Sequence, residues 1–95
     1  MARPKQLTGV AKTLADRGKR YGDFDGHAEI TQDLKDVMRA TEGWEQLTPS
    51  MKEALEMVAH KIGRILNGDP TYADSWHDIA GYATLVEQQL GEGGK

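Results

Sequence analysis

Four acidic side chains in the second half of the sequence have the spacing of a divalent-metal site. Glu53 and Glu56 lie one helical turn apart, and so do Asp74 and Asp78. Residues at these spacings share one face of a helix, so two helices folded against each other could direct all four carboxylates into one volume. A ligand set made only of carboxylate oxygens favours magnesium or manganese over zinc. The sequence therefore offers a candidate magnesium site.

The same carboxylates have a simpler explanation. Acidic side chains on helix surfaces are usually solvated, and aspartates near a helix N-terminus are stabilised by the helix dipole without any metal. Lys61 and Arg64 could pair with Asp78 and Glu56 as salt bridges between helices. His60, one turn after Glu56, could be an extra ligand, a proton acceptor or a polar filler. Spacing alone leaves the metal site and the salt bridges both open.

The elements that would position these side chains are all helices. Apolar residues recur at intervals of three and four, and no segment has the alternation of a strand. Thr48 and Pro49 predict the start of one helix, and Asn67 and Gly68 predict its end. We expect one all-α domain over residues 1–95, a four-helix arrangement with a short first helix, with Trp44 plugging the edge of the core. The predicted helices span 7–17, 27–41, 49–66 and 73–90, and flexible tails are expected at 1–6 and 91–95.

Length and composition limit the class of protein. A chain of 95 residues buries only part of its unfolded surface, so dimerisation is a natural way to complete its core. The absence of cysteine excludes disulfides and thiolate metal sites and fits a reducing cytoplasm. No apolar run approaches the roughly 20 residues of a membrane span, and a signal peptide is not apparent. We expect a cytoplasmic homodimer without membrane association.

Positive charge is concentrated near the N-terminus. Residues 1–20 contain six bases and one acid and carry +5, whereas the remaining residues carry −8. Such a segment could bind nucleic acid or nucleotide phosphates, or could complement the acidic body of the fold or of a dimer. The acidic body makes nucleic acid the least favoured ligand. Residues 17–27, RGKRYGDFDGH, fit either a phosphate or base contact or an ordinary loop between helices.

Two sequence patterns resemble known families. KEALE at 52–56 and SWHDIAGYATLV at 75–86 resemble the MazG-like all-α nucleoside triphosphate pyrophosphohydrolases, whose signature is Glu-Glu-x-x-Glu on one helix and Glu-x-x-Asp on the next. Glu53, Glu56 and Asp78 match three of these acids, whereas Lys52 and Ser75 stand where two others are expected. Residues 17–90 are also similar to small, uncharacterised phage and prophage proteins, with an RGxRYGDF-like opening, a central EALEMxAHKIxRILNGDP and a SWxDIAGYA ending.

The first resemblance implies magnesium-dependent hydrolysis of a nucleoside triphosphate to a monophosphate and pyrophosphate. Glu53, Glu56 and Asp78 would be catalytic, and Asp74 would replace the missing glutamate as a fourth metal ligand. Other side chains would hold the phosphates and the base: Arg17, Lys19, Arg20, Tyr21, Lys61 and Arg64. Two alternatives stay open. One is a catalytically inactive phage protein that binds a host or phage partner, and the other is a nucleic-acid-binding dimer that uses the basic N-terminus.

Overall fold

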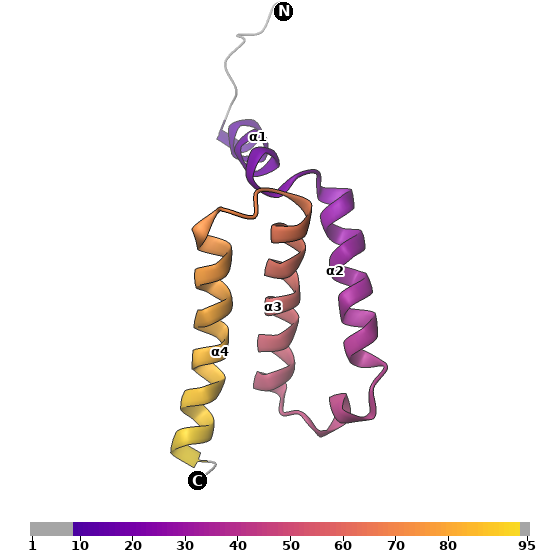
Figure 1. The fold of residues 1–95 in the computed structure, drawn as a ribbon, viewed down its shortest axis with the longest axis vertical. Helices are drawn as coiled ribbons and strands as arrows, with labels where there is room; N and C mark the ends of the chain where they lie inside the picture. Colours follow the sequence, from indigo (N-terminus) through magenta and orange to yellow (C-terminus); the bar gives the residue numbers. More distant parts are fainter. Residues whose placement is uncertain (1–8, 94–95) are drawn as a thin grey trace, which may run out of the picture.

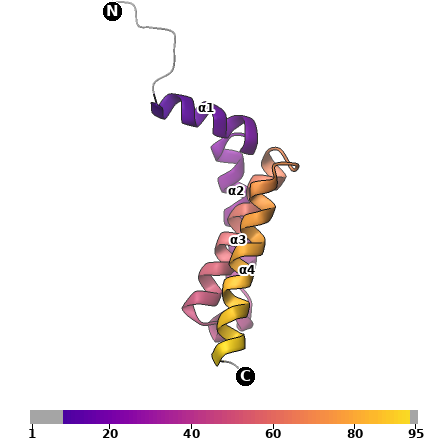
Figure 2. The same ribbon diagram turned by 90° about the vertical axis from the view of Figure 1, so that its left-hand side faces the viewer.

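The computed structural model describes residues 9–93, and these residues form helices without any strand. The elements are α1 (Gly9–Tyr21), α2 (Phe24–Arg39), the 3-10 helix η1 (Glu42–Gln46), α3 (Pro49–Asn67) and α4 (Ala73–Gly93). Figure 1 shows α2, α3 and α4 side by side in one layer, with α3 in the middle, and Figure 2 shows α1 projecting from one end of that layer. The all-α prediction is confirmed.

Local capping explains where the two central helices begin. The Thr48 side chain accepts a hydrogen bond from the Met51 backbone amide at 3.2 Å, and Pro49 occupies the first helical position of α3, as the sequence predicts. The carboxylate of Asp23 accepts from the Gly26 amide at 3.1 Å and caps α2. Because this cap lies before Phe24, α2 begins three residues earlier than predicted.

Three other predicted boundaries need correction. α1 continues through Gly18, which was expected to end it, to Tyr21, because a single glycine inside a helix costs only about 1 kcal/mol. α2 ends at Arg39 rather than at residue 41. α4 extends to Gly93, so residues 91–93 are helical where a flexible tail was expected. The predicted tail at 1–6 lies outside the described residues.

The apolar core within residues 9–93 is small. Its buried apolar side chains are Trp44, Ala54 and Ala59, and no large side chain in the described part is completely buried. Trp44 on η1 is buried, in keeping with the core position expected for it. On α4, Trp76 and Leu90 are 56% and 47% exposed. The reason is that α4 packs mainly on α3, so one layer of helices covers only one side of it.

A glycine on α3, Gly63, allows α2 and α3 to pack closely against each other. A Cβ atom on Gly63 would overlap the Thr31 hydroxyl and would press on the His27 ring, so only glycine allows this approach. His27 and Thr31 lie one turn apart on α2, and both are buried. None of the helices in residues 9–93 combines the length and the apolar character needed to cross a membrane.

Candidate functional site

Two of the carboxylates predicted to bind magnesium are paired with basic side chains. Glu56 accepts two hydrogen bonds from the guanidinium of Arg39 on α2, at 2.8 and 3.2 Å. Asp78 forms an ion pair with Lys61, with 2.9 Å between Oδ2 and Nζ. The Lys61–Asp78 salt bridge anticipated as an alternative is therefore present, whereas Glu56 pairs with Arg39 and not with Arg64.

The register between α3 and α4 separates Glu53 from the aspartates. The two helices run in opposite directions, and Lys61 faces Asp78. Glu53 lies eight residues before Lys61, which places it roughly 12 Å away along the helix axis. Asp74 lies one turn before Asp78 in α4 and accepts a hydrogen bond from the Tyr72 hydroxyl at 3.0 Å. The four carboxylates therefore do not meet.

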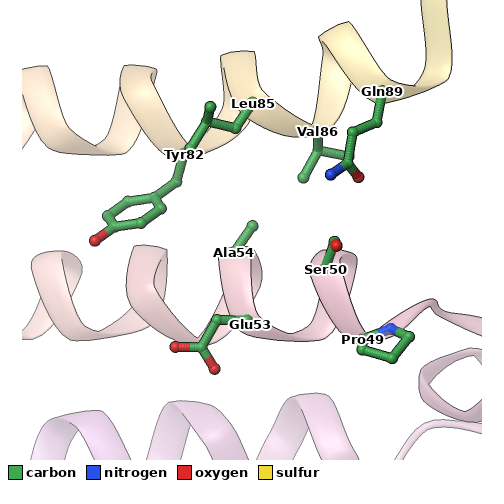
Figure 3. A pocket seen from close by; sticks show the side chains of 8 residues that line it. All are labelled: Pro49, Ser50, Glu53, Ala54, Tyr82, Leu85, Val86 and Gln89. Carbon is green, nitrogen blue, oxygen red and sulfur yellow. The ribbon is translucent and has the colours of Figure 1, made fainter. Parts of the chain in front are cut away.

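Magnesium does not fit this arrangement. Within residues 9–93 no group of three or more histidine, aspartate or glutamate side chains is placed to hold a metal ion. In Figure 3 the carboxylate of Glu53 turns away from α4, while Ser50 and Ala54 face it. These residues belong to a groove of about 430 Å³ between α3 and α4. Its other lining residues are Pro49, Tyr82, Leu85, Val86 and Gln89.

The ion pair of Lys61 and Asp78 has a structural role. Lys61 is 8% exposed, and a buried ammonium group needs a partner because desolvation penalises an isolated charge. The hydrogen bond from Lys61 and its positive charge lower the pKa of Asp78. Both side chains are thus engaged with each other across α3 and α4, and neither is free to serve a phosphate or a metal in this conformation.

A second hollow brings other predicted ligand residues together. It has a volume of about 560 Å³ and lies between α1, α2 and α3, and we call it the α1–α3 cleft. Arg17, Tyr21 and Arg64, three of the residues predicted to contact phosphate or base, line it. Lys19, Arg20 and Lys61 from the same prediction do not. Its remaining lining residues are Leu14, Gly18, Gly22, Asp23, Phe24, His27 and His60.

Asn67 at the end of α3 holds the turn that shapes the α1–α3 cleft. Its Nδ2 donates to the carbonyl oxygens of Tyr21 and Asp23 at 2.7 and 2.8 Å. Gly22 has a φ of +77°, and Gly26 also packs against Asn67. Gly22 and Gly26 thus make room for the asparagine. Most of residues 17–27 is helical, and only residues 22–23 connect α1 to α2.

Aromatic rings hold Arg64 in place. Its guanidinium carbon lies 4.2 Å from the centroid of the Tyr21 ring, at the distance of a cation–π contact. The rings of Tyr21 and Tyr72 meet edge to face with 6.0 Å between their centroids. The guanidinium carbon of Arg20 lies over the Tyr72 ring, 4.9 Å from its centroid. Arg20 therefore turns toward Tyr72, while Arg64 lines the cleft as a planar cation.

Two histidines form the inner wall of the cleft. His27 Nε2 lies 3.3 Å from His60 Nδ1, and the rings meet edge to face with centroids 4.5 Å apart. His27 Nδ1 and Thr31 Oγ1 are buried without a hydrogen-bond partner. Burial and the charge of Arg64 lower the pKa of both histidines, that of His60 to about 4. Both rings are therefore neutral at physiological pH.

The sequence pointed to His60 but not to His27. The predicted helices place His27 only at the start of a helix, although two features of the sequence indicate a close contact between that helix and the next. His27 and Thr31 share a face of α2, and Gly63 lies one turn beyond Ala59 and His60 on α3. A glycine in mid-helix often marks a close approach of a neighbouring element. The pairing itself depends on how α2 crosses α3, which spacing along the chain does not reveal.

The α1–α3 cleft has the chemistry of a site for an anionic aromatic ligand. Two guanidinium groups, on Arg17 and Arg64, are suited to phosphate oxygens. Phe24 is 76% exposed beside them and offers a ring face for stacking. The volume lies within the range of small-molecule sites in proteins.

Comparison with known proteins gives one match. The family model of a domain of unknown function, DUF6378, matches residues 7–90. Neither the search of curated proteins nor the search of solved structures gave a match.

Proposed function

The chain belongs to the DUF6378 family, and we propose that it binds a nucleotide in the α1–α3 cleft. The observation that carries the proposal is the convergence of Arg17, Arg64 and the exposed ring of Phe24 on one hollow of about 560 Å³. The proposal keeps the nucleotide expected from the sequence. It places that ligand in the cleft that α3 forms with α1 and α2, and not between the acidic faces of α3 and α4.

The phosphates would lie between Arg17 and Arg64. Guanidinium groups make paired hydrogen bonds to phosphate oxygens, and Arg64 is already oriented by its stacking on Tyr21. Among the described residues, Asp23 is the one acid that lines the cleft, and its carboxylate is occupied in capping α2. The two cations that line the cleft, from α1 and α3, therefore favour an anion there.

The base would stack on Phe24. This ring is the most exposed of the large apolar side chains in residues 9–93, although it stands at the beginning of an ordered helix. Its centroid lies 6.4 Å from that of His27, so a base on Phe24 would adjoin the histidine pair. Exposed aromatic faces are a common platform for nucleobases because stacking buries apolar area without demanding one base.

Calorimetric titration with nucleoside mono-, di- and triphosphates tests this proposal. We expect Arg17→Gln to weaken binding by roughly tenfold to a hundredfold, the range for loss of a charged hydrogen bond. Lys19→Gln is the matched control, because this residue is an exposed base on the same helix that does not line the cleft. Equal losses in the two variants would show that only the net charge of α1 matters and would refute a site at Arg17.

Hydrolysis of the nucleotide stays a prediction from the MazG-like resemblance. Glu56, Asp74 and Asp78 have other partners and Glu53 lies apart from the aspartates, so we derive no catalytic step through that metal. Release of pyrophosphate from a panel of triphosphates, with and without magnesium, tests the activity directly. The relation to phage proteins likewise rests on the sequence patterns alone.

We also propose that the chain forms a homodimer. Large apolar side chains remain exposed on α1 and α4, among them Val10, Leu14, Trp76 and Leu85. α1 carries four bases and one acid, whereas α4 carries four acids and neither lysine nor arginine. These two surfaces are complementary in charge and both are apolar in part, so a second copy is the partner that fits them. If the protein instead stays monomeric, the same exposed face would be open to a host or phage protein.

A further inference from the structure

The histidine pair is the part of the α1–α3 cleft that phosphate and base contacts leave unused. His27 is 6% exposed and its Nε2 is joined to His60 Nδ1, whereas His60 is only half-buried and lines the cleft. A proton taken up from solvent therefore enters through His60. The pair connects the ligand site with the buried contact between α2 and α3.

The surroundings of the pair are mostly cationic. Arg17 on α1 lines the same cleft, and the positive charges of Arg64, Lys61 and Lys35 all act on the pair from α3 and α2. Asp23, which lines the same cleft, is occupied in capping α2, and Asp78 on α4 is paired with Lys61. Within the described residues no carboxylate pairs with either imidazole.

A bound phosphate would reverse this balance. Its negative charge between Arg17 and Arg64 would stabilise a cation on His60, which the free protein disfavours. Whichever tautomer the neutral ring has, protonated His60 carries both N–H groups, so Nδ1–H can donate to His27 Nε2 while Nε2–H donates to a phosphate oxygen. His27 remains neutral as the acceptor, so the pair needs only one added proton.

We infer that His60 takes up a proton together with the nucleotide, so that the cleft binds its ligand more tightly in mildly acidic conditions. This inference rests on the proposed function, because it concerns the same cleft and the same phosphate. It assigns His60 a binding role that depends on its protonation, with His27 as the residue that positions its ring.

The pKa of His60 with and without ligand is the direct measurement. Titration of the imidazole proton resonances should show a pKa of about 4 in the free protein and a higher pKa when the tightest-binding nucleotide of the panel saturates the cleft. If the pKa returns to its ordinary value of about 6.5, affinity rises by about tenfold between roughly pH 7.5 and roughly pH 5.5. The phosphate's own protonation opposes this rise, so the wild type is compared with His60→Asn, in which only the phosphate effect remains.

The outcomes separate the two proposals. A raised His60 pKa, with a pH dependence of affinity that His60→Asn loses, supports the inference. Nucleotide binding with an unchanged His60 pKa overturns the inference and leaves the nucleotide site intact. Absence of nucleotide binding at both pH values overturns the nucleotide site and the inference together. The resonance measurement uses the wild-type protein, so it does not depend on the folding of His60→Asn.

Discussion

Gly22 and Asn67 are fitted to each other although they lie far apart in the sequence. Gly22 has a φ of +77°, and a Cβ atom there would overlap the backbone carbonyl of Asn67. The side chain of Asn67 in turn donates to the carbonyl of Tyr21, the residue before this glycine. This contact ties the turn between α1 and α2 to the end of α3 and thereby forms the α1–α3 cleft.

Gly22→Ala should therefore destabilise the protein strongly. Alanine is strained at this φ and would displace Asn67, so we expect a loss of about 1–3 kcal/mol in the free energy of unfolding. Gly18→Ala is the control, because nothing lies within 4 Å of its Cβ position in α1. That variant should gain about 0.5–1 kcal/mol from helix propensity. Urea unfolding measures both, and equal effects would show that Asn67 does not clamp the turn.

A second glycine pair tests the contact between α2 and α3. Gly63→Ala would press on Thr31 and His27, and overpacking of this kind costs about 1–3 kcal/mol. Gly81→Ala in α4 meets nothing within 4 Å and should be neutral or stabilising. Thermal unfolding of the two variants gives the comparison. A Gly63→Ala protein as stable as wild type would mean that the two helices do not approach so closely.

The helices were predictable because their signals are local. Thr48 and Pro49 set the start of α3, and Asn67 and Gly68 set its end, which was predicted to within one residue. The candidate metal site was not predictable in this way. Glu53 and Asp78 lie on the correct helices, but the Lys61–Asp78 contact fixes a register that holds them apart. The cleft depends on the Gly22–Asn67 contact, which periodicity does not encode.

The Lys61–Asp78 pair predicts an asymmetric effect on stability. Asp78→Asn leaves the buried Lys61 without a countercharge, so we expect the melting temperature to fall by several degrees at neutral pH. Lys61→Met removes the buried charge and should restore most of the loss when combined with Asp78→Asn. Since the pKa of Asp78 is lowered in the folded protein, its contribution is present at neutral pH and is lost in acid, below the ordinary range for aspartate. Glu87→Gln, an exposed acid on the same helix, should change nothing.

The stability of the fold should also fall as the pH is lowered into the range in which His60 of the unfolded chain takes up a proton. Its pKa is about 4 in the folded protein and about 6.5 in the unfolded chain, so the unfolded chain binds more protons between these values. The melting temperature should therefore decrease as the pH is lowered from about 6.5 toward about 4. His60→Asn should flatten this part of the profile, whereas His77→Asn on the exposed side of α4 should not. Identical profiles for all three proteins would contradict a His60 ring that folding keeps neutral.

The proposed dimer is tested by a single polar substitution on α4. Leu85 is 58% exposed, and Leu85→Gln should shift the protein toward a monomer if α4 forms the interface. Val37→Gln on α2 replaces a residue that is 69% exposed and serves as the control. Light scattering over a range of concentrations measures the mass. A wild-type protein that stays monomeric throughout would refute the dimer.

The position of a bound nucleotide tests the central claim most directly. A crystal structure determined with nucleotide and magnesium present should show the phosphates between Arg17 and Arg64 and the base against Phe24, with the Lys61–Asp78 ion pair intact. A nucleotide held through metal by Glu53 and Asp78 on the α3–α4 side, with the α1–α3 cleft empty, would contradict the account.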